Sequence, residues 1–183
     1  MKIEISRLIH DKNYCGKVFN FFINKEIIKK VNPALFEKHL NKSFANLEFG
    51  NFVFSEHEYS IKKKLKNKKF YGWCVVIYYY AIYHSVLALI SKAGFYSKNH
   101  LASISALTYI YYHKRNVLEK EDIGFVISNL NIQGEDIKFI FDSKDIREKA
   151  SYGVDEEFDF RIARELQEKT ADFVNKVKEI LNE

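Results

Sequence analysis

FYGWCVVIYYYAIYHSVLALISKA, residues 70–93, is the stretch that decides the fold. It contains no proline and a single glycine, Gly72, and it is apolar on most sides of a helical wheel. A helix that is hydrophobic nearly all round belongs at the centre of a bundle. The sequence therefore predicts a long, buried central helix over residues 70–93. No uninterrupted apolar run within it reaches the length that a membrane span needs.

Apolar residues also recur at helical spacing on both sides of this stretch. Seven glycines and one proline leave few of the turns that an all-β sandwich or barrel needs. We therefore expect an all-α fold, namely an antiparallel helical bundle of four to five core helices over residues 34–183 with an N-terminal helical extension over residues 1–33. The spacing predicts helices over about 12–30, 32–54, 97–111, 121–130, 137–153 and 156–181, besides the central one.

Length and composition favour one substantial core, because 183 residues with 47% hydrophobic content suit a single domain. Cys15 and Cys74 lie in apolar stretches without metal-ligand spacing, which predicts buried free thiols in a reducing cytoplasm. Met1–His10 lacks the pattern of a secretory signal. We expect a soluble, cytoplasmic protein. The sequence has no glycine-rich phosphate loop, paired-cysteine metal site or nucleophile elbow, so no metal and no cofactor is expected.

Charge is distributed unevenly along the chain. Residues 1–120 hold 20 Lys and Arg against 8 acids, whereas residues 121–183 hold 9 against 16. This split fits a basic face for nucleic acid, or two faces of opposite charge that pair in a dimer. The alternative is a lysine-rich composition without functional meaning, since 24 of the 29 cations are Lys.

Four stretches resemble the HEPN family, in the branch usually found beside minimal nucleotidyltransferases. They are YYAIYHS at residues 79–85, GFYSKNHLAS at residues 94–103, DIREKASYG at residues 145–153 and KHLNKSFANLEFGNF at residues 38–52. Their order is similar to that of the family, and the resemblance covers about residues 34–183. It implies a bundle of four or five helices that forms a homodimer through its long helices. Many members are metal-independent ribonucleases, toxins or phage-defence effectors.

The family's ribonuclease motif places a His four to six residues after an Arg, and none of the five arginines here has one. The motif is therefore degenerate. The resemblance leaves His84, His100, Arg147 and Tyr152 as candidate catalytic residues, since imidazole can move protons and guanidinium can stabilise phosphate charge. The alternative interpretation makes His84 a hydrogen-bonded core histidine and pairs Arg147 with a nearby acid. His100 is the better candidate, because it opens a helix whose backbone N–H groups favour an anion.

Basic residues near tyrosines suggest RNA contacts. Lysines fill six of the nine positions 61–69. Tyrosines 78–80 and 83, and 109, 111 and 112, could stack on bases, although most must pack internally because consecutive helical residues point in different directions. A solvated lysine loop also needs no ligand. The candidate RNA-binding residues are Lys62, Lys63, Lys64, Lys98, Lys114 and Arg115.

Three functional hypotheses follow. The first is an RNA-binding or RNA-cleaving HEPN protein of toxin or phage-defence type, a possible metal-independent ribonuclease. The second is a non-catalytic partner or substrate of a separate nucleotidyltransferase in a toxin–antitoxin pair, which the missing motif histidine favours. The third is a structural homodimer without ligand.

Overall fold

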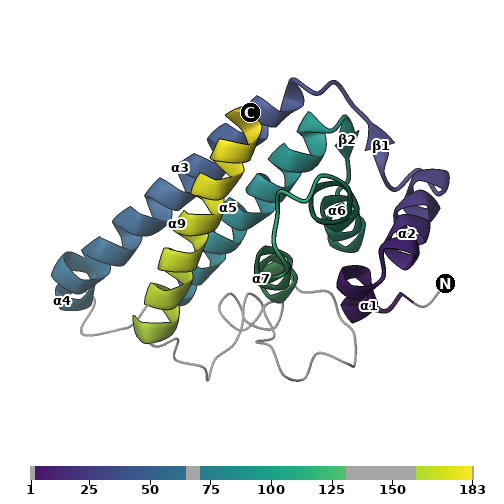
Figure 1. The fold of residues 1–183 in the computed structure, drawn as a ribbon. Coiled ribbons are helices and arrows are strands. Elements are labelled where there is room, and N and C mark those ends of the chain that lie inside the picture. The colour runs from purple at the N-terminus through teal and green to yellow at the C-terminus, as the bar shows by residue number, and fades with distance from the viewer. Residues whose placement is uncertain (1–2, 65–70, 131–159, 183) are drawn as a thin grey trace.

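The structure is a computed structural model, and it describes residues 3–64, 71–130 and 160–182. These residues fold into helices with one small two-stranded sheet (Figure 1). The all-α bundle expected from the sequence is confirmed. The elements are α1 (Ile5–His10), α2 (Lys12–Asn24), β1 (Lys29–Lys30), α3 (Leu35–Glu56), the π-helical turn η1 (His57–Ile61), α4 (Lys62–Lys64), α5 (Tyr71–Lys92), β2 (Phe95–Tyr96), α6 (His100–Leu107), the π-helical turns η2 (Thr108–Lys114), α7 (Lys120–Leu130) and α9 (Phe160–Asn182).

Helix α5 is the central element, as its composition predicts. It packs along α3 and α9 on one side and against α6 and α7 on another (Figure 1). An 18-residue window of α5 is apolar enough to cross a membrane by length and composition, but 78% of that window is buried inside the protein. Burial of this extent is what the core helix of a soluble bundle shows.

Helices α3 and α5 approach closely because small residues lie between them. Gly50 of α3 faces the ring of Tyr78, which is fully buried. About two turns nearer the start of α3, the Ser43 hydroxyl donates to the Ala81 carbonyl at 2.9 Å and lies 2.6 Å from the Ser85 hydroxyl. Two serines that satisfy each other can be buried without the cost of an unpaired polar group.

Helix α9 covers the other side of this pair. The Asn51 side-chain oxygen accepts hydrogen bonds from Tyr78 of α5 at 3.0 Å and from Gln167 of α9 at 2.8 Å, so one amide joins three helices. Farther along α9, Lys176 donates to Asp122 of α7 at 2.6 Å. Phe173 and Val177 of this helix are buried in the core.

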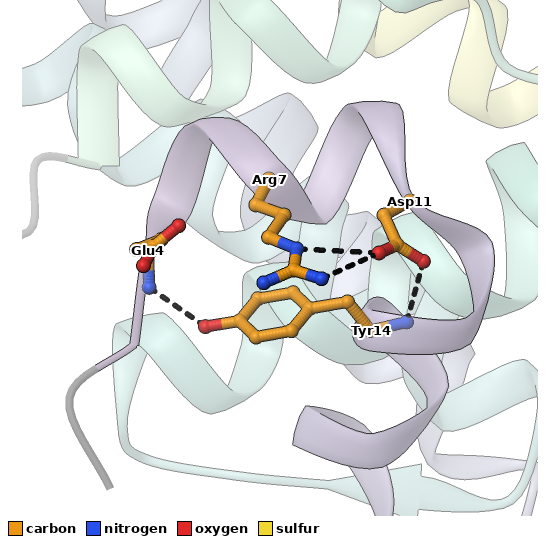
Figure 2. Close-up of polar contacts among 4 residues, drawn as sticks. All are labelled: Glu4, Arg7, Asp11 and Tyr14. Carbon is orange, nitrogen blue, oxygen red and sulfur yellow. Dashed lines mark hydrogen bonds and ion pairs between the residues drawn. The ribbon is translucent and has the colours of Figure 1, made fainter.

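The N-terminal helices pack on α6 and η2. Leu8, Cys15, Val18 and Phe22 belong to the same buried cluster as the centre of α5. Both cysteines are free and buried, as predicted, and burial raises the pKa of Cys15 to about 12. Figure 2 shows how α1 and α2 are joined: Asp11 accepts the Tyr14 backbone N–H and two hydrogen bonds from Arg7.

The prediction of one helix over residues 12–30 is wrong over its last six residues, 25–30. Helix α2 ends at Asn24, and Glu26 has a φ of 55°, which a continuing right-handed helix does not allow. Lys29 and Lys30 then pair with Tyr96 and Phe95 as an antiparallel ladder. The sequence pattern did not reveal this end, because two apolar residues, Ile27 and Ile28, fit a helix and an extended segment equally well.

The other described helices begin and end within a few residues of their expected positions. Helix α6 continues through η2 to Lys114, three residues beyond the predicted end at residue 111. Helix α1 was not predicted, because six residues give too short a pattern. The predicted helix over residues 137–153 lies outside the described residues.

Candidate functional site

The two candidate histidines lie on neighbouring helices and contact the same tyrosine. His84 is in the middle of α5, and His100 is the first residue of α6. The Tyr83 ring lies 5.7 Å from the His84 ring and 4.8 Å from the His100 ring, measured between centroids. Both histidines are half-buried. Arg147 and Tyr152, the other two candidate catalytic residues, lie outside the described residues.

A third histidine, which the sequence analysis did not select, completes this region. His39 of α3 places its Nδ1 atom 3.2 Å from the Nδ1 atom of His84, with the rings stacked at 5.4 Å. On its other side His39 stacks on Tyr96 of β2 at 5.8 Å. The sequence signal was available: His39 and Ser43 are polar residues four positions apart in an apolar helix face, which indicates a buried polar contact.

We call these residues the histidine cluster: His39, His84 and His100 with Tyr79, Tyr83 and Tyr96. The Tyr79 hydroxyl lies 3.1 Å from His100 Nε2, and the Tyr79 and Tyr83 rings stack at 6.3 Å. The cluster therefore draws on α3, α5, β2 and the start of α6. Asn99 caps α6 by accepting the Ala102 N–H at 2.9 Å, which fixes the position of His100.

The local environment favours uncharged imidazoles. Burial, then the neighbouring His84 and then Lys42, lower the pKa of His39 to about 4. Burial and then Lys42 lower the pKa of His84 as well. Burial, followed by Tyr96 and Tyr79, raises the pKa of Tyr83 to about 12. At neutral pH the His39–His84 pair is therefore neutral, with one Nδ1 carrying the hydrogen and the other accepting it.

The described residues contain no group of three or more His, Cys, Asp or Glu side chains placed to hold a metal ion. The histidine cluster has three imidazoles, but its geometry does not bring them to one point. What the cluster offers chemically is acid–base groups and hydrogen-bond donors next to the positive charge of Lys42.

The predicted RNA-binding residues fall at three separate places. Lys98 is exposed two residues before His100, at the histidine cluster. Lys114 and Arg115 are exposed at the other end of the α6–η2 segment, about 20 Å away by helical rise. Their cations lie over the rings of Tyr109 and Tyr111 at 4.7 and 4.8 Å.

The lysine run begins far from the histidine cluster. Lys63 and Lys64 are exposed in α4, beyond the far end of α3 from His39, and the part of α3 between His39 and its end is about 25 Å long. Lys62 also belongs to α4, but its side chain lies outside the described part of the chain. The candidate RNA-binding residues whose side chains are described therefore do not form one continuous basic patch.

The three consecutive tyrosines point in different directions, as predicted. Tyr78 and Tyr79 are buried, whereas Tyr80 is 41% exposed. Tyr111 is fully buried and donates to the Leu89 carbonyl at 2.6 Å. Of these four, only Tyr80 presents a ring to solvent for stacking.

No protein-family model matches this chain, and a search of the curated proteins finds no significant match. The HEPN resemblance of its motifs stays a prediction.

Proposed function

We propose that this protein is an RNA-directed protein of the HEPN type, acting in a toxin or phage-defence role, with the histidine cluster as its site. The observation that supports the proposal is the contact between His39 and His84, with His100 reached across the Tyr83 ring. Lys42 acts on the first two histidines, and Lys98 is exposed two residues before His100. RNA cleavage without a metal needs a base for the 2′-hydroxyl and cations for the phosphate, and neutral imidazoles and lysines are the groups that provide them. Arg147 and Tyr152 remain part of the proposed site.

An RNA-binding and cleavage assay tests this proposal. The purified protein is incubated with labelled single-stranded RNA and with transfer RNA at two salt concentrations, together with His84→Ala, His100→Ala and Arg147→Ala variants. The matched control is His10→Ala, because His10 is exposed at the end of α1. We expect salt-sensitive binding that the site variants weaken at least tenfold and the control leaves unchanged. The proposal would be disproved if the unaltered protein neither bound nor cleaved RNA.

We further propose that the protein works as a homodimer through α3 and α5. Phe49 and Phe52 of α3 and Trp73 and Tyr80 of α5 are 41–60% exposed. Phe49 lies about 200° around α3 from Asn51, and Tyr80 lies about 200° around α5 from Tyr78, which hydrogen-bonds Asn51. Because Asn51 faces α9, Phe49 and Tyr80 point away from α9. Large exposed aromatic rings in one region mark an interaction surface.

Light scattering tests the dimer. Trp73→Glu should convert a dimer into a monomer, whereas Tyr59→Glu, at a ring that is 76% exposed on η1, should leave the mass unchanged. A monomeric unaltered protein would disprove this part of the proposal. A dimer that binds no RNA would favour the structural role instead. No contact among the described residues specifically favours the nucleotidyltransferase partner.

A further inference from the structure

The His39–His84 contact is an unusual way to join two helices. A distance of 3.2 Å between two Nδ1 atoms requires one N–H and one lone pair, so the pair can form this hydrogen bond only while at least one ring is neutral. The Ser43–Ser85 pair beside it makes a similar interhelical contact and also donates to the Ala81 carbonyl. If joining α3 and α5 were the only role of this position, a second serine pair would have been sufficient.

The imidazole pair is also incompletely satisfied. His39 Nε2 is buried and has no hydrogen-bond partner among the described residues. Buried polar atoms are nearly always paired, and an exception in a polar network calls for a functional explanation.

Lys42 is the charged side chain that acts on the pair among the described residues. Lys42 of α3 acts on both histidines, and the remaining titratable neighbours are Tyr83 of α5, Tyr96 of β2 and, across Tyr83, His100 of α6. No carboxylate within the described ranges forms an ion pair with His39 or His84. A proton on the pair is thus opposed by burial and by Lys42, and nothing among the described groups compensates for it.

We propose that Lys42 and the His39–His84 pair bind a phosphate group, and that the pair takes up one proton as the anion binds. Burial is the main reason that the pair is neutral, and Lys42 adds to it; an anion next to Lys42 offsets this repulsion and supplies an opposite charge for a proton on the pair. The bound anion favours a state in which one of the two imidazoles is cationic and donates its Nδ1 hydrogen to the neutral partner. If the proposed function holds, the phosphate belongs to the RNA backbone, and its binding sets the protonation state of the site before any chemistry.

The link between proton and anion makes affinity depend on pH in a defined direction. Because the bound form holds one more proton than the free form, affinity increases as pH falls, by at most about tenfold per pH unit. Between about pH 7.5 and pH 6 we expect an increase of about five- to tenfold.

Two probes separate the sources of the phosphate chemistry. Sulfate is a free tetrahedral anion whose charge is constant over this pH range, and an unstructured single-stranded RNA presents phosphodiesters. Binding of each is measured at both pH values, and the nitrogen shifts of the six histidines are followed by NMR in the same samples. His39→Gln keeps a polar group but cannot be protonated, Lys42→Gln removes the nearby cation, and His10→Gln is the matched control.

The expected result is tighter binding of sulfate at the lower pH, with protonation signals at His39 and His84. His39→Gln should abolish the pH dependence, Lys42→Gln should weaken binding at both pH values, and His10→Gln should do neither. The NMR measurement uses only the unaltered protein, so it can disprove the inference even if a variant does not fold.

Other outcomes are equally decisive. Sulfate binding that is absent, or that does not change with pH, overturns this inference even if RNA binds elsewhere and the proposed function survives. Proton-linked sulfate binding without RNA binding supports the anion site and disproves the proposed function. Stoichiometric Zn²⁺ binding that requires both His39 and His84 also overturns the inference, because the pair would then be a pair of metal ligands.

Discussion

Individual polar and small residues set how closely α3 and α5 approach. Ser43, Gly50 and Asn51 lie on the faces of α3 that contact α5 and α9, and each has specific partners on the neighbouring helices. Side chains of this size let two backbones pack tightly while their polar atoms stay satisfied. His39 belongs to the same series, but it is the member whose hydrogen bonding is incomplete.

Gly50→Ala tests this close approach. A Cβ atom at Gly50 would lie 2.6 Å from Cε1 and 2.9 Å from Cδ1 of Tyr78, a ring that is fully buried and has little room to move. We expect a loss of about 1–3 kcal/mol in the free energy of unfolding, measured with urea.

Gly124→Ala is the matched control for this experiment. Gly124 lies inside α7 and a Cβ atom there meets nothing within 4 Å. Alanine should therefore raise the free energy of unfolding by about 0.5–1 kcal/mol through helix propensity. Equal effects of the two substitutions would contradict tight packing at Gly50.

Acid should destabilise the protein through His39. Its pKa of about 4 lies below the value of about 6.5 for an unfolded histidine, so the unfolded chain binds the proton first as pH falls. The stabilisation is therefore present above about pH 6.5 and is lost between that value and about pH 4. Because the ring is half exposed, we expect unaltered protein to lose on the order of 1 kcal/mol more than His39→Gln over this window.

Urea unfolding at several pH values, in buffers without multivalent anions, measures this difference. Parallel pH profiles for the two proteins would show that the imidazole pair carries no proton penalty.

At the scale of elements, hydrogen bonds at helix ends decide where the N-terminal helices begin and end. Asp11 ends α1, because its backbone N–H donates to the Arg7 backbone carbonyl. Asp11 also caps α2, because its carboxylate accepts the Tyr14 backbone N–H at 2.8 Å. The Tyr14 hydroxyl in turn accepts the Glu4 N–H at 2.8 Å, and the Arg7 guanidinium lies over the Tyr14 ring (Figure 2). The two helices are thus joined within eleven residues.

Substitutions of Asp11 separate its two roles. The backbone N–H of Tyr14 and then the Arg7 side chain lower the pKa of Asp11, so its contribution is present above an ordinary carboxyl pKa and disappears as pH falls through the lower folded value. Asp11→Asn keeps an oxygen for the Tyr14 N–H but loses the charge, whereas Asp11→Ala loses both. At neutral pH we expect the unaltered protein to melt at the highest temperature, Asp11→Asn at a lower one and Asp11→Ala at the lowest. Identical melting of all three would contradict a capping role.

Across the whole molecule, residues from both ends of the chain share one core. Leu8 and Phe22 from the N-terminal helices belong to the same buried cluster as Ile82 and Leu89 of α5 and Val177 of α9. The sequence divided the chain into an extension over residues 1–33 and a bundle over residues 34–183. A shared cluster means that folding of the second segment draws on side chains of the first.

Truncation tests that dependence. A chain of residues 34–183 would expose the apolar surface that α1 and α2 cover, and we expect it to aggregate or to lose cooperative unfolding and fixed side-chain signals in NMR. A truncated chain that unfolds cooperatively would show instead that residues 34–183 form an independent domain.

Point variants in α2 give the matched comparison. Phe22→Ala, at a side chain 5% exposed, should cost about 3–5 kcal/mol of unfolding free energy. Lys17→Ala, at an exposed position of the same helix, should change it by less than about 0.5 kcal/mol.

The sequence by itself determined the elements of this protein and their burial. Helical periodicity predicted α3, α5, α7 and α9, and the continuous apolar character of residues 70–93 placed α5 at the centre, because both signals lie within one segment of chain. Buried free cysteines and the two buried tyrosines of the Tyr78–Tyr80 run followed from the same local patterns.

Only the tertiary structure decided which polar groups meet. His39 and His84 are 45 residues apart, and His100 approaches them through Tyr83, so no local spacing could reveal their contact. The β1–β2 ladder escaped prediction for the same reason, since each strand has two residues and gains its hydrogen bonds from a partner more than sixty residues away. Contacts of this kind depend on how helices pack, and packing is a property of pairs of segments that a single segment does not encode.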